Sequence, residues 1–173
     1  MIQRIIEKEQ IYSIEYYLYL FVCGSMLGWC LEFIFRTICI GSLANPGFLN
    51  GPYCPIYGIA FILITLLCHH KNKMISFAKI YVFTTVLEYI TAILLELIFH
   101  KTLWDYSSMP LSTGSRINLL FSLIWGILGV FVLFKIIPNL KNIYFQKQQT
   151  MKDFVYFVMF IQFLDFIYVI VTI

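Results

Sequence analysis

The sequence predicts an all-α membrane protein, a polytopic helix bundle with about five transmembrane helices. Hydrophobic residues make up 61% of the 173 residues and charged residues only 12%, against roughly 25% charged residues in a typical soluble domain. The apolar residues gather in long runs, and a helix needs about 20 apolar residues to cross a bilayer. Because no polar tract is long enough to form a second domain, residues 1–173 are predicted to be one integral membrane domain.

Four apolar runs have the length of a membrane span, and a fifth run is shorter. The long runs cover residues 17–40, 79–99, 117–137 and 154–173. The short run, residues 56–68, directly follows a segment rich in glycine and proline. We expect the second helix either to begin inside that segment or to follow a re-entrant turn formed by it. The polar and basic stretch 138–152 is typical of a cytoplasmic connector.

Lysine and arginine divide unevenly between alternating loops. One side holds nine of the twelve basic residues, the other holds only Lys101 and Arg116, and Arg36 lies within the first helix. The positive-inside rule then predicts a multi-pass protein of the plasma membrane with a cytoplasmic N-terminus and an outer C-terminus. The nine residues are Arg4, Lys8, Lys71, Lys73, Lys79, Lys135, Lys141, Lys147 and Lys152.

The segment Asn45–Gly58, NPGFLNGPYCPIYG, has the most unusual composition in the chain; we call it the Gly/Pro segment. Glycine permits close backbone approach and proline fixes φ, so the mixture specifies a non-helical path. At membrane depth such backbone persists only where it is buried in protein or lines a wet cavity. We therefore expect a fixed wall or lid over a polar pocket. Its predicted members are Asn45, Gly47, Phe48, Gly51, Pro52, Tyr53, Cys54, Pro55, Tyr57 and Gly58.

Ionisable residues inside membrane helices are rare and usually functional. Glu32 and Arg36 are four residues apart, so they share a helix face and can pair. Glu88 has no evident cationic partner, which suits carrying a proton or donating a hydrogen bond. The alternative is that the buried charges only fix helix register. The predicted substrate or ion pocket, on the outer side beside the Gly/Pro segment, comprises Glu32, Arg36, Glu88, Glu96, Asp105 and Arg116.

The sequence argues against several other chemistries. It contains no P-loop, no GxSxG elbow and no cluster with metal-ligand spacing, so we expect no metal, no cofactor and no catalytic residues. The net charge of +3 is scattered over loops and chain ends, which argues against nucleic-acid binding. Four aromatic residues are expected to anchor the membrane interface or to pack between helices. These are Trp29, Trp104, Tyr106 and Trp125.

A set of ordered blocks resembles the ABC-transporter type IV family, also called CmpB-type permeases. The blocks are GWCLEFIFR (28–36), the Gly/Pro segment, LEY (87–89), LLELIF (94–99), WDYS (104–107) and GSRINLLFSLIWGILG (114–129). They cover roughly residues 20–135 and leave the last helix outside. The family usually has arginine where this chain has Pro46.

The resemblance implies a permease subunit that works with a separate ATPase, with itself as a homo-oligomer, or with both, among membrane lipids. In this hypothesis the arginines and backbone amides contact substrate, and Glu88 or Glu96 carries a proton or binds a cation. A second hypothesis is a membrane-embedded enzyme that acts on a lipid-linked substrate at the outer leaflet, with the same acids as general acid and base. A third is a non-catalytic scaffolding subunit.

Overall fold

The computed structural model describes residues 12–41, 43, 45–68 and 72–173. Three residues that contribute to the predicted charge asymmetry, Arg4, Lys8 and Lys71, lie outside this described part.

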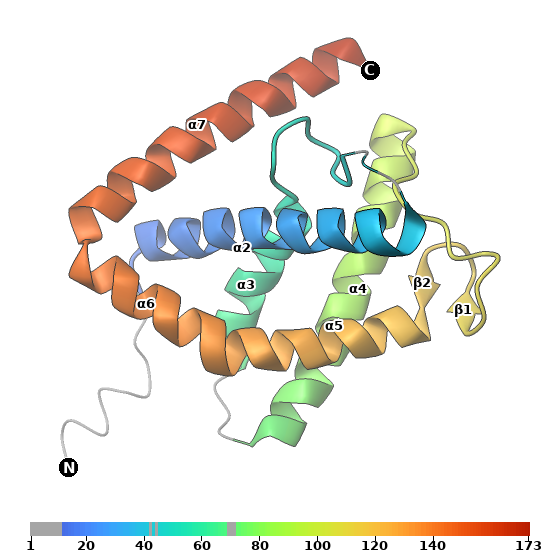
Figure 1. Cartoon of the computed structure of the whole chain (residues 1–173), viewed down its shortest axis with the longest axis horizontal. Coiled ribbons are helices and arrows are strands. Elements are labelled where there is room, and N and C mark those ends of the chain that lie inside the picture. The colour runs from blue at the N-terminus through green and yellow to red at the C-terminus, as the bar shows by residue number, and fades with distance from the viewer. Residues whose placement is uncertain (1–11, 42, 44, 69–71) are drawn as a thin grey trace.

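Three long helical segments follow alternating directions across the molecule (Figure 1). The first is α2, Ile14–Phe35, which ends in a π-helical turn, Arg36–Ile40. The second begins as α5, Leu119–Phe131, and continues through another π-helical turn, Val132–Ile136, into α6, Ile137–Gln146. The chain reverses at Lys147, and α7, Gln148–Thr172, returns along the bundle.

Two further helices cross these three at a steep angle (Figure 1). They are α3, Pro55–Leu67, and α4, Lys73–Phe99. Pro55 opens α3 at the first helical position, where its missing N–H is not needed. Asn72 caps α4 by accepting hydrogen bonds from the amides of Met74 and Ile75.

The chain between α4 and α5 contains a small antiparallel hairpin. Its strands are β1, Ser112–Thr113, and β2, Ile117–Asn118, with Ser112 opposite Asn118. Asn118 then caps α5 through hydrogen bonds from the amides of Leu120 and Phe121. The hairpin therefore fixes where α5 begins, next to the end of the α2 helix (Figure 1).

The predicted all-α membrane bundle is confirmed, and the chain is a multi-pass membrane protein. Within the described residues, four helical segments of 25 to 28 residues are apolar and long enough to cross a bilayer. The shorter apolar helix α3 has 13 residues and begins inside the Gly/Pro segment, without a helical turn before it. Five crossings therefore remains a prediction, as does the orientation of the termini.

The connector predicted at 138–152 is mostly helical, and its cytoplasmic placement stays a prediction. The helix α6 follows directly from the π-helical turn after α5, and α7 begins two residues after α6 ends. Pro138 does not stop the helix, since the π-helical turn before it leaves proline at the start of the new α-helical segment. The reversal is confined to Lys147, whose backbone leaves the helical region.

The main hydrophobic core lies at the end of the bundle where α2 begins. Tyr16 and Tyr144 are fully buried there, with their ring centroids 5.2 Å apart. Ile64 of α3, Ile80 of α4 and Val155 of α7 complete this core from the surrounding helices. A smaller core of Leu49, Tyr53 and Val169 joins the Gly/Pro segment to α7.

Close approach of α2 and α3 depends on glycine. A methyl group at Gly28 would collide with the ring of Tyr57, and one at Gly58 would collide with the side chain of Ser25 and the backbone of Phe21. The two helices therefore pack through glycine on both surfaces, the arrangement that small residues permit in membranes. This contact brings the start of α3 against the half of α2 that carries Glu32.

Candidate functional site

The Gly/Pro segment is fastened at its start to α2. The side-chain oxygen of Asn45 accepts hydrogen bonds from Trp29 Nε1 at 2.8 Å and from the amide of Gly47 at 3.1 Å. Its Nδ2 donates to the carbonyl oxygens of Leu49 and Asn50. Trp29, predicted as an interface or packing residue, thus also holds the segment through a hydrogen bond.

The middle of the segment is fastened to α7 through Asp165. This carboxylate accepts hydrogen bonds from Asn50 Nδ2 and from the amide of Gly51, both at 2.9 Å. The hydroxyl of Tyr53 bonds to the same side chain. Burial raises the pKa of Tyr53 to about 12, and the negative charge of Asp165 adds to this shift. Sequence reasoning did not place Asp165 in the site.

The end of the segment is held against the middle of α2. The amide of Cys54 donates a 2.9 Å hydrogen bond to the carbonyl of Ser25. The Cys54 thiol is buried, and burial raises its pKa to about 12. The charge of Glu32 adds to the shift and that of Arg36 opposes it, so both side chains lie near this thiol.

Glu32 is held by two partners. Its Oε2 accepts a 2.7 Å hydrogen bond from the hydroxyl of Tyr57, and its Oε1 lies 3.4 Å from Arg36 Nε. The pairing of Glu32 and Arg36 expected from their spacing is therefore present. Arg36 also donates to the carbonyl of Leu103 at 3.2 Å, which ties α2 to the loop after α4.

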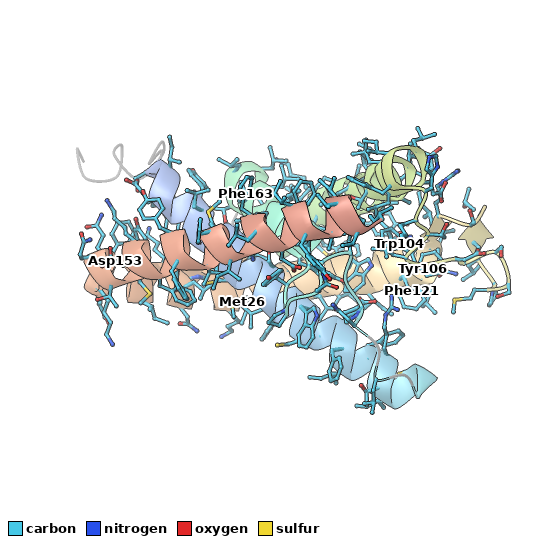
Figure 2. All side chains as sticks on the ribbon, turned by 90° about the horizontal axis from the view of Figure 1, so that it is seen from above. Met26, Trp104, Tyr106, Phe121, Asp153 and Phe163 are labelled. Carbon is cyan, nitrogen blue, oxygen red and sulfur yellow. The ribbon has the colours of Figure 1, made fainter. Side chains whose placement is uncertain are left out.

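Glu88 approaches the same region from α4. It is 6% exposed, and its Oε1 accepts a 2.9 Å hydrogen bond from the hydroxyl of Tyr106. The ring of Tyr106 stacks on Phe121 of α5 with centroids 5.2 Å apart (Figure 2). Burial and the carboxylates of Glu88 and Glu32 raise the pKa of Tyr106, so the phenol stays protonated and acts as a donor.

Five of the residues described above, namely Glu32, Arg36, Tyr57, Glu88 and Tyr106, form one group that we call the carboxylate cluster. Charges on Glu32 and Arg36 act on Tyr106, and the charge on Glu32 also acts on Glu88. Each acid accepts a hydrogen bond from one tyrosine hydroxyl, Glu32 from Tyr57 and Glu88 from Tyr106.

A second polar group lies two helical turns farther along α4, about 12 Å from Glu88. Arg116 donates to Glu96 Oε2 from Nε at 3.0 Å and from Nη2 at 2.6 Å. These hydrogen bonds raise the pKa of Arg116. Trp104 Nε1 donates to the carbonyl of Arg116 at 3.2 Å, so the loop before the hairpin is tied to the turn between its two strands.

Asp105 lies on the exposed surface of the loop. Its carboxylate accepts a 2.8 Å hydrogen bond from the amide of Ser107, and this bond lowers its pKa. Two of the four aromatic residues predicted to anchor or pack between helices contact the cluster. Trp125 meets Tyr57 edge to face at 5.5 Å, and Tyr106 is itself a cluster member. The sequence gives no sign that the Tyr106 hydroxyl donates to Glu88, because the two residues are 18 positions apart.

The site is built from carboxylates, one arginine and two phenols. Within the described residues, no three His, Cys, Asp or Glu side chains come together as metal ligands would. The arrangement offers acceptors for cationic or hydroxylated ligands at Glu32 and Glu88, and guanidinium donors at Arg36 and Arg116.

Comparison with protein families identifies the chain. The model of the family described as "Putative ABC-transporter type IV" matches residues 19–170. The chain belongs to this family. The match to the ABC-transporter type IV family extends past the 20–135 expected from individual blocks and includes most of α7. No curated protein and no solved structure matches the chain.

Proposed function

We propose that this chain is a permease-type subunit of a membrane transporter, with a polar pocket that opens outward. Membership of the ABC-transporter type IV family supports a transport role. The observation that carries the pocket is the convergence of Glu32, Arg36 and Glu88 beside Tyr57. Tyr57 lies in the first turn of α3, where the Gly/Pro segment becomes helical. The segment is the lid of this pocket, pinned by Asn45 and Asp165.

The charged residues of the pocket have different roles, which depend on their positions. Arg36 and Arg116, with backbone amides of the Gly/Pro segment, contact an acceptor-rich substrate. Glu32, Glu88 and Glu96 hold these arginines or meet positive groups of the substrate. Asp105, on the loop surface, lies at the mouth of the pocket and attracts cations by charge alone.

The partners follow from the family and from the sequence. The sequence has no P-loop, so ATP-driven movement requires a separate ATPase subunit. Five helices enclose little space, so self-association of two or more copies completes the path. We place the complex in the plasma membrane, with the pocket on the side away from the basic loops.

Ligand-induced stabilisation tests this function directly. The full chain in lipid nanodiscs is heated with a panel of small anionic, cationic and zwitterionic solutes. A solute that binds only the folded protein at 100 times its Kd stabilises it by about 2.7 kcal/mol. We expect at least one solute to raise the unfolding temperature of the wild type and to lose this effect in the combined variant E88Q, E96Q and R116A.

The control is Asp153→Asn, at the far end of α7 (Figure 2), which should leave the response unchanged. A solute that stabilises the wild type and the combined variant equally would contradict the pocket. A shift in lipid or envelope composition on deletion, with no change in solute uptake, would favour the lipid-linked enzyme instead. Unchanged function after Glu32 and Arg36 are both replaced by apolar residues would favour the scaffold.

A further inference from the structure

Glu88 has one carboxylate oxygen that the protein does not satisfy. Its Oε1 accepts the hydrogen bond from Tyr106, but its Oε2 is fully buried and, among the described residues, has no hydrogen-bond partner. Only 6% of the residue is exposed. Leaving a buried carboxylate oxygen unpaired is costly, and more so at membrane depth. The position therefore calls for a positive charge that the described side chains do not supply.

The charged groups around Glu88 also leave a net negative charge. Arg36 is the cation of the carboxylate cluster, and its nearest contacts are Glu32 and the carbonyl of Leu103. Two carboxylates against one guanidinium leave one negative charge. Tyr106 and Tyr57 are neutral hydroxyl groups, so they donate hydrogen bonds without changing this balance.

We propose that Glu88 binds one monovalent cation, a proton or an alkali metal ion, at its unpaired oxygen. The role of this cation in transport rests on the proposed function, whereas its binding can be tested without a solute. One positive charge at Oε2 balances the net negative charge of the cluster. Tyr106 positions the carboxyl group by holding the other oxygen.

The structure gives Glu88 and Glu96 different environments, although the sequence left the cation-binding role open to either acid. Glu96 already has a cation, because Arg116 donates two hydrogen bonds to one of its oxygens. Its side chain is 26% exposed, so water reaches it as well. An acid with a fixed guanidinium partner has little need of a second positive charge. Glu88 is therefore the acid that binds the cation, whereas Glu96 stays paired with Arg116.

Other titratable groups face this site from the packed elements. They are Glu32 from α2, Arg36 from the π-helical turn after it, Tyr57 from the first turn of α3 with Cys54 beside it, and Tyr106 from the loop after α4. Of these, Glu32 is the other acid, and its two oxygens already have partners in Tyr57 and Arg36. A measurement must therefore distinguish Glu88 from Glu32 by substitution.

Infrared difference spectroscopy of the full chain in nanodiscs can detect the cation on Glu88. At neutral pH in a buffer with choline as its cation, we expect a protonated-carboxyl band that disappears in E88Q. The matched control E96Q should keep the band. Replacing choline by sodium or potassium distinguishes the two sources. An unchanged band assigns the site to a proton, and loss of the band assigns it to the alkali metal ion, which displaces the proton.

The variant Tyr106→Phe keeps the test decisive if E88Q does not fold. It removes the donor to Oε1, so the carboxyl band of Glu88 should move to higher frequency. A wild-type spectrum with no band in choline that responds to E88Q or Tyr106→Phe would overturn the proposal. Because the readout needs no solute movement, a band in a protein that binds no solute would reject the proposed function and leave this cation site standing.

Discussion

The hydroxyl of Tyr57 donates a 2.7 Å hydrogen bond to Oε2 of Glu32, joining the first turn of α3 to α2. Tyr57→Phe removes this bond and leaves a part-buried carboxylate oxygen without its donor. Hydrogen bonds to charged groups contribute about 1.5–3 kcal/mol, so we expect a loss of that size in unfolding free energy. Unfolding by SDS in mixed micelles measures it. Tyr156→Phe, on an exposed face of α7, is the control and should change stability little.

Asp165→Asn should loosen the Gly/Pro segment. Asparagine keeps one acceptor oxygen, but its amide group then faces the donors Asn50 Nδ2 or the Gly51 amide. Hydrogen exchange measured by mass spectrometry should therefore speed up in peptides covering residues 45–54, by about tenfold for each 1.4 kcal/mol lost. Asp153→Asn should leave these peptides unchanged. Equal exchange in wild type and D165N would show that α7 does not hold the segment.

Gly28→Leu should separate α2 from α3. Any side chain at this position collides with the ring of Tyr57, and overpacking of this kind costs about 1–3 kcal/mol. Cys30→Leu adds similar bulk two residues away on an exposed face and is the matched control. A thermal unfolding midpoint that falls only in the Gly28 variant is the expected result. Similar midpoints in the two variants would mean that α3 can move away at no cost.

Cys54 should resist alkylation. Its thiol is buried and its pKa is raised to about 12, while thiolate is the reactive form. In single-cysteine variants, Cys54 should react with iodoacetamide more slowly than the exposed Cys39. Its rate should rise about tenfold per pH unit in the alkaline range, because each unit below the pKa multiplies the thiolate fraction by ten. A rate that levels off near neutral pH would rule out the raised pKa.

The pair of Glu96 and Arg116 should contribute little to stability. Its side chains are 26% and 38% exposed, and exposed ion pairs contribute about 0–1 kcal/mol. A double-mutant cycle with E96Q and R116Q in mixed micelles measures the coupling. A coupling well above that range would show that the membrane shields the pair, and would give Glu96 a larger role than we assign to it.

The sequence was informative where partners are close along the chain. Runs of apolar residues located the helices, and the four-residue spacing of Glu32 and Arg36 predicted their contact. The Gly/Pro segment marked the region in which α3 begins. Each of these inferences depends on local geometry, namely the helical repeat or a backbone restriction, which residue identity alone determines.

Contacts between distant residues could not be predicted in this way. Asp165 lies 115 residues from Asn50, and Tyr57 lies 25 residues from Glu32. Which helix faces cross is decided by packing, here by the glycine surfaces of α2 and α3, and a single sequence does not reveal crossing angles. The helical α6 was missed for a different reason. Its polar composition resembles a loop, and the preceding π-helical turn that accommodates Pro138 leaves no sequence signal.

The short length of α3 has a consequence for the surrounding lipid. Thirteen residues give a helix about 20 Å long, whereas the hydrocarbon layer is about 30 Å thick. The four long segments, of 25 to 28 residues, match or exceed that thickness. If α3 crosses the bilayer as predicted, the lipids beside it must compress or yield to water, while those beside the long helices remain extended. The stability of the protein should then depend on acyl-chain length, because a thinner bilayer needs less distortion beside α3.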